Sequence, residues 1–121
     1  MAFTKQVVIA GGTPVATLLN GPTELYGLSA TNSQGTPAIY YVKFYWQGVG
    51  APPPGTSVVN PVVGTTLPQL TIPVPVGGLF NLSFDPMNNG GPLWYWVTLN
   101  ALQTDATAIA TGGDVLSFIL G

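Results

Sequence analysis

The sequence predicts an all-β domain, an antiparallel, jelly-roll-like β-sandwich of about eight strands. Its 16 glycines and 12 prolines recur at spaced points such as Gly11-Gly12 and Gly77-Gly78, where they signal turns. Short runs rich in β-branched and aromatic residues lie between these turns. No segment shows the apolar periodicity of a long amphipathic helix, so two packed sheets are the favoured architecture.

The expected strands are the apolar runs between the turn signals. They cover residues 3–10, 15–19, 24–31, 38–46, 69–76, 79–84, 93–100 and 115–120. Together they form one domain over residues 1–121, with an N-terminal arm (1–10), a Pro/Gly-rich loop (47–67) and a second long connection (102–114). The order of the strands does not follow from the pattern.

Two runs carry further detail. In residues 38–46, strict alternation puts Tyr40 and Phe44 on one face and Lys43 on the other, which we expect to be the wetter face. In residues 69–76, Pro73 and Pro75 lie two apart and lack backbone donors. We therefore expect that strand at the edge of a sheet.

Charged residues make up only 5% of the chain, where soluble domains carry about 25%. The six are Lys5, Lys43, Glu24, Asp85, Asp105 and Asp114, and the net charge is −2. Nucleic acid is an unsuitable partner because phosphate binding needs clustered Lys or Arg. We expect no membrane partner either, since no apolar run is long enough to span a bilayer. Weak charge repulsion between copies favours association.

The chain has no His, Cys or Arg, and it therefore lacks the usual general base, thiol nucleophile and anion clamp of active sites. We expect neither an enzyme nor a cofactor. Asp85, Asp105 and Asp114 could form a glycosidase-type pair or a metal site. All three adjoin turn residues, so hydrogen bonding within turns is the favoured interpretation, and we predict no metal.

Aromatic residues stand side by side in three places: Tyr40-Tyr41, Tyr45-Trp46 and Trp94-Tyr95-Trp96. Neighbouring residues of a strand point to opposite faces, so rings are expected on both faces of a sheet. Core packing accounts for about half of them. The others suit contact with a protein, where Tyr and Trp are favoured anchors, or with a sugar ring.

Four short pieces between Tyr26 and Thr107 resemble small virion proteins of tailed bacteriophages. They are Tyr26-Gly27-Leu28-Ser29-Ala30-Thr31-Asn32, Tyr41-Val42-Lys43-Phe44-Tyr45, the stretch from Pro68 to Pro75 followed by Gly77-Gly78, and Thr104-Asp105-Ala106-Thr107. The resemblance implies a one-domain β-sandwich on the capsid exterior, of the decoration or cement type. It brings no catalytic residues with it.

Composition and resemblance together predict a structural virion protein that decorates and stabilises a capsid. Its expected partners are the major capsid protein and sister copies, as a dimer or trimer, at the virion surface. The candidate contact residues are Phe3, Val7, Pro52, Pro53, Pro54, Val58, Val59, Trp94 and Trp96. The alternatives are a carbohydrate- or receptor-binding module of a phage tail or collar and, with less support, a small hydrolase using Asp85 and Asp105.

Overall fold

The computed structural model describes residues 3–22, 24–34, 39–47, 60–87, 91–109 and 112–121. Each of the eight expected runs overlaps one observed strand. The strands are β1 (Phe3–Val8), β2 (Thr17–Pro22), β3 (Leu25–Asn32), β4 (Tyr40–Trp46), β5 (Leu70–Val74), β6 (Gly77–Met87), β7 (Pro92–Thr98) and β8 (Val115–Leu120). No helix among the described residues is long and apolar enough to cross a membrane.

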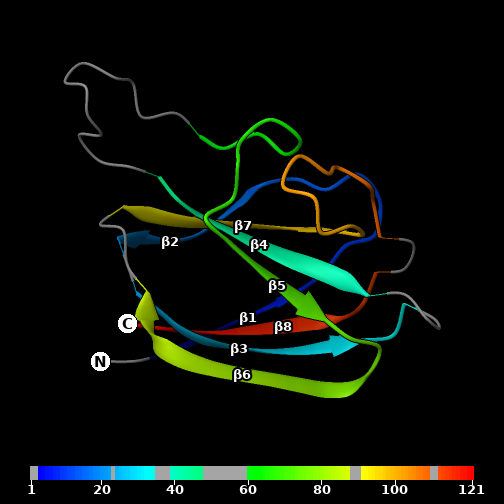
Figure 1. The fold of residues 1–121 in the computed structure, drawn as a ribbon. Helices are drawn as coiled ribbons and strands as arrows, with labels where there is room; N and C mark the ends of the chain where they lie inside the picture. The colour runs from blue at the N-terminus through cyan, green and yellow to red at the C-terminus, as the bar shows by residue number, and fades with distance from the viewer. Residues whose placement is uncertain (1–2, 23, 35–38, 48–59, 88–90, 110–111) are drawn as a thin grey trace.

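The strands form two four-stranded antiparallel sheets, ordered β1-β8-β3-β6 and β2-β7-β4-β5 (Figure 1). Four of the pairings are nested along the chain: β1 with β8, β2 with β7, β3 with β6 and β4 with β5. A long hairpin folded over into two sheets gives this order, which is that of a jelly roll. The predicted fold class is therefore confirmed.

The core lies between the two sheets and follows the alternation seen in the sequence. Tyr40, Val42, Phe44 and Trp46 of β4 are at most 1% exposed, and Leu116, Phe118 and Leu120 meet them from β8. Phe44 and Phe118 pack edge to face with ring centroids 5.8 Å apart. Each such side chain contributes about 1.5–3 kcal/mol through burial, so no disulfide is needed to hold the sheets together.

β5 is an edge strand, as its prolines predict. Among the described strands it pairs only with β4 and ends its sheet, and Pro73, opposite Tyr41 in the register, is exposed. The missing proline donor therefore costs no ladder hydrogen bond.

The outer face of β4 is the wetter one, as predicted: Ile39 is 38% exposed and Tyr41 and Tyr45 are partly exposed, whereas the inner face is buried. Lys43, the residue that indicated this face, is nevertheless buried. Lys43 is 0% exposed, and Trp96, opposite it on β7, is 1% exposed. The connection that follows β7 lies over Lys43, whose Nζ donates to the Leu102 carbonyl oxygen at 2.6 Å. Gln103 Nε2 reaches the Pro68 carbonyl just before β5. A strand's alternation shows which residues share a face, but not whether a distant loop covers that face.

Candidate docking surfaces

Asp114 serves the fold from a buried position. Its carboxylate accepts hydrogen bonds from Thr31 Oγ1 at 3.2 Å, Ser33 N at 2.8 Å and Gln34 Nε2 at 2.7 Å. The side chain is 2% exposed and stands just before β8. It therefore ties the end of β3 to the start of β8, and its oxygens are engaged within the chain.

Asp105 organises the connection between β7 and β8. Its carboxylate accepts from the Thr107 backbone N–H at 3.2 Å, two residues along the chain, and from Thr107 Oγ1 and the Asn100 side chain. Burial alone would raise the pKa of Asp105, but these hydrogen bonds outweigh it and hold the pKa below its ordinary value. The expected turn hydrogen bonding is thus confirmed for Asp105.

The two carboxylates are held by different parts of the fold. Asp114 bonds to groups near the end of β3, and Asp105 to its own turn. Among the described residues, no group of three potential ligand side chains could hold a metal ion. The side chain of Asp85 lies outside what the structure describes.

The two candidate tryptophans have different surroundings. Trp94 is half-buried, and its Nε1 donates to Gln47 Oε1 at 3.0 Å. Trp96 is 1% exposed, and its Nε1 has no hydrogen-bond partner within the described chain. Trp96 is therefore a packing residue of this face and is not exposed for a partner, whereas part of Trp94 is.

The N-terminal candidates belong to a strand, not to a free arm. β1 pairs along its whole length with β8, from Phe3 opposite Leu120 onward. Phe3 is 46% exposed, while Val7 is partly buried against the core. Lys5 donates from Nζ to the Leu19 carbonyl of β2 at 2.6 Å, which joins the two sheets at this edge of the sandwich.

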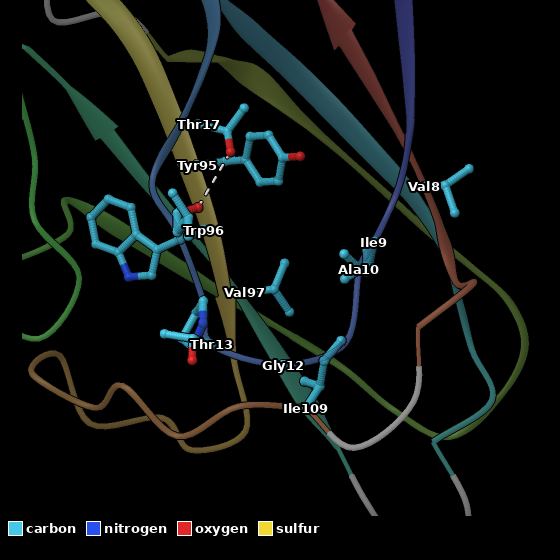
Figure 2. Close-up of a pocket in the computed structure, with 12 residues that line it drawn as sticks. Val8, Ile9, Ala10, Gly12, Thr13, Thr17, Tyr95, Trp96, Val97 and Ile109 are labelled. Atoms are coloured by element: carbon cyan, nitrogen blue, oxygen red, sulfur yellow. Dashed lines mark hydrogen bonds between the residues drawn. The ribbon is translucent and has the colours of Figure 1, made fainter.

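A pocket of about 230 Å³ opens between the segment linking β1 to β2 and strand β7. Figure 2 shows Tyr95 and Val97 on one side, with Ile9 opposite them and Ile109 at one end. A β-bridge between Gly12 and Ile109 closes that end. None of the lining residues carries a charge, so the pocket suits apolar groups. The exposed Val8 and Val15 form part of its lining.

A larger apolar groove of about 560 Å³ runs along the opposite edge, between the edge strands β5 and β6. Ile39 lines it together with side chains from β5 and β6, among them Leu70, Ile72, Phe80 and Leu82. No residue of the lining is charged. The sequence pattern does not indicate this groove, although the edge prolines Pro73 and Pro75, which also line it, indicate where the sandwich ends.

The described surface combines exposed apolar side chains with very little charge. Two of the six charged residues, Lys43 and Asp114, are buried. The large apolar side chains that are exposed are Phe3, Val8, Val15, Leu18, Ile39, Val62, Leu67, Val76, Leu79 and Leu102. Candidates Pro52, Pro53, Pro54, Val58 and Val59 lie outside the described residues.

Comparison with protein-family models, with curated proteins and with solved structures gave no significant match.

Proposed function

We propose that this chain is a structural protein of a tailed-phage virion that decorates the capsid exterior and stabilises it. The observation that carries the proposal is the near-absence of surface charge beside exposed apolar side chains at the edges of a jelly roll. Such a surface gains free energy by being covered. Four pieces of the sequence resemble small phage virion proteins, and this resemblance is the reason for proposing a capsid as the surface that this chain covers.

The described side chains that could take part in catalysis make structural hydrogen bonds instead. Asp105 and Asp114 accept hydrogen bonds from the loops they organise, and Lys43 donates to a backbone carbonyl. A hydrolase using Asp85 and Asp105 would need one of its two carboxylates to leave the turn that it holds. These contacts favour a docking role over a catalytic one.

We assign contact with the capsid to the edge formed by β1, β2 and the segment between them, the β1–β2 edge. Val8 and Val15 are 67% and 70% exposed there, and both line the same pocket. Phe3 of β1 and Leu18 of β2 are also exposed apolar side chains, at 46% and 48%. A specific contact needs at least about 1,000 Å² of total buried surface.

A bound copy stabilises the capsid by mass action, because it binds the assembled shell and not the free subunits. Repetition over the shell adds avidity if copies also touch one another. Modest individual contacts are then sufficient for firm retention.

The carbohydrate-binding alternative has less support. It rested on the excess of aromatic side chains, but of the two candidate tryptophans Trp96 is 1% exposed and Trp94 is held by Gln47. A sugar platform needs flat, open ring faces.

The test is binding to empty capsids of the phage or prophage that encodes the chain, prepared without it. We expect saturable, stoichiometric co-sedimentation and a higher temperature of capsid disruption. Changing Val8→Ser together with Val15→Ser should weaken binding at least tenfold. The control, Val62→Ser with Leu102→Ser, likewise replaces two exposed apolar side chains by serine, at positions elsewhere that are 59% and 70% exposed, and it should bind normally.

Absence of binding by the folded wild-type protein would overturn the proposed function. Equal losses in the two double variants would overturn the assignment of the β1–β2 edge. Binding to a glycan array that Trp94→Ala abolishes, without capsid binding, would favour the alternative.

A further inference from the structure

The two sheets expose four edge strands, and three of them carry features that hinder pairing with another chain. β5 contains Pro73, which has no backbone donor. β2 has two register shifts and ends at Pro22. β1 carries Lys5, whose side chain turns inward to Leu19. Irregularities, prolines and inward-pointing charges are the usual protections of natural sheet edges.

β6 has no such protection in its central part. Its register with β3 is regular from Leu79 opposite Thr31 to Ser83 opposite Gly27, and the shifts lie beyond these pairs. Residues 79–83 contain neither proline nor charge, and Leu79 is 68% exposed. Within the described chain β6 pairs only with β3, so the backbone groups on its other side remain open to a further strand (Figure 1).

The apolar groove adjoins this open edge. Phe80 and Leu82 pack against the core and line the groove together with Leu70 and Ile72. Leu79, Asn81 and Ser83 lie on the opposite, exposed face of β6. A strand added alongside β6 would place every second side chain over the groove. That strand must therefore alternate apolar side chains toward the groove with others toward solvent.

We propose that the added strand is β6 of a second copy of this chain, antiparallel to the first, so that the two sheets continue into one. The chain's own β6 has the required alternation, with Phe80 and Leu82 on the groove side. Two such strands carry no like charges that would repel one another between residues 79 and 83. A two-fold axis gives both copies the same contact, which closes the dimer and leaves neither β6 edge open.

The register follows from the regular stretch, whose middle residue is Asn81. With the axis at Asn81, Phe80 faces Leu82 of the second copy over the groove. On the outer face, Leu79 lies opposite Ser83 of the second copy. The main-chain hydrogen bonds give affinity, and the groove supplies apolar burial. This dimer does not rest on the proposed function, because it would form in solution without a capsid.

Cross-linking tests the register. The sequence has no cysteine, so one introduced thiol reports a single contact. Directly opposed residues of antiparallel strands have Cα atoms about 4.5–5.5 Å apart, within the range a disulfide spans. Asn81→Cys should give a covalent dimer under mild oxidation. Gln6→Cys is the matched control: it lies exposed on the other edge of the same sheet and, like Asn81, bonds to a neighbouring serine. It should stay monomeric in denaturing electrophoresis.

Charge placement tests the same interface without a cross-link. Leu79→Lys with Ser83→Lys would set lysines opposite each other across the axis, and should weaken dimerisation at least tenfold in sedimentation equilibrium. Leu79→Lys with Ser83→Glu sets opposite charges there and should restore it. Both positions are exposed, so both variants should fold, which circular dichroism checks.

A folded wild-type protein that stays monomeric at all concentrations would overturn the inference. So would a dimer that Asn81→Cys does not lock, or one that both charge variants leave intact, because it would use another face. None of these outcomes bears on capsid binding, which is measured separately.

Discussion

Lys43 Nζ lies 2.6 Å from the carbonyl oxygen of Leu102, and this bond fastens the β7–β8 connection onto the outer face of β4. Burial lowers the pKa of Lys43, and nearby Asp105 partly opposes the shift. The lysine is thus a buried anchor for the connection. The other lysine, Lys5, makes a similar bond to Leu19 at the sandwich edge.

Replacing this anchor should loosen the connection without unfolding the sandwich. In Lys43→Met the Leu102 carbonyl loses its charged donor, and a hydrogen bond of this kind is worth about 1.5–3 kcal/mol. We expect at least tenfold faster hydrogen exchange of the Leu99 and Asp105 amides, which bond within the connection. Lys5→Met is the control and should leave these two amides unchanged. Equal rates in wild type and Lys43→Met would contradict the anchoring role.

The two described aspartates should differ in their effect on stability. Asp114→Asn removes the charge that four groups of Thr31, Ser33 and Gln34, near the end of β3, bond to in a buried site. We expect a loss of at least about 2 kcal/mol in the free energy of unfolding, measured by urea denaturation. Asp105→Asn affects a more exposed turn, so its loss should be smaller. The reverse order would show that Asp114 does not join β3 to β8.

Gly27 is required by the close approach of β3 and β6. A Cβ added there would lie 2.6 Å from the backbone carbonyl oxygen of Leu82, which cannot move aside without shifting β6. Gly27→Ala should therefore cost about 1–3 kcal/mol of unfolding free energy. At Gly21 an added Cβ meets nothing within 4 Å, so Gly21→Ala should change thermal stability little. If both variants melt alike, β6 moves more freely than this contact implies.

Stability should fall as the pH rises above 10. Burial, with a smaller contribution from Asp114, raises the pKa of Tyr40 well above its ordinary value of 10.0. Above pH 10 the unfolded chain loses this proton while the folded protein keeps it, so the contribution of Tyr40 to stability is full below pH 10 and disappears above it. Urea midpoints on both sides of pH 10 measure the fall.

The control for this pH dependence is Tyr40→Phe, which removes the hydroxyl group that donates to the Thr31 carbonyl. Its stability should fall less steeply above pH 10. A remaining slope is expected from Tyr95, whose pKa burial also raises. Identical slopes in the two proteins would argue against the raised pKa of Tyr40.

The sequence predicted what local chemistry controls and missed what distant segments cover. Alternation in β4 identified the core face with Tyr40 and Phe44, and Pro73 identified an edge, because both effects act within one strand. The burial of Lys43 depends on a connection that begins after β7. The apolar groove forms because β5 and β6 are the edge strands of different sheets and lie on the same side of the sandwich. Neither follows from a residue's own neighbours in the sequence.

The nested strand order also determines when the domain can be completed during synthesis. Of the eight described strands, β8 is synthesised last, yet it lies inside its sheet between β1 and β3. Among the described strands β1 pairs with β8 and with no other, so β1 has no partner until β8 has been made. A nascent chain that has not yet released β8 lacks Leu116 and Phe118 from its core, so this domain cannot finish folding before β8 has been translated.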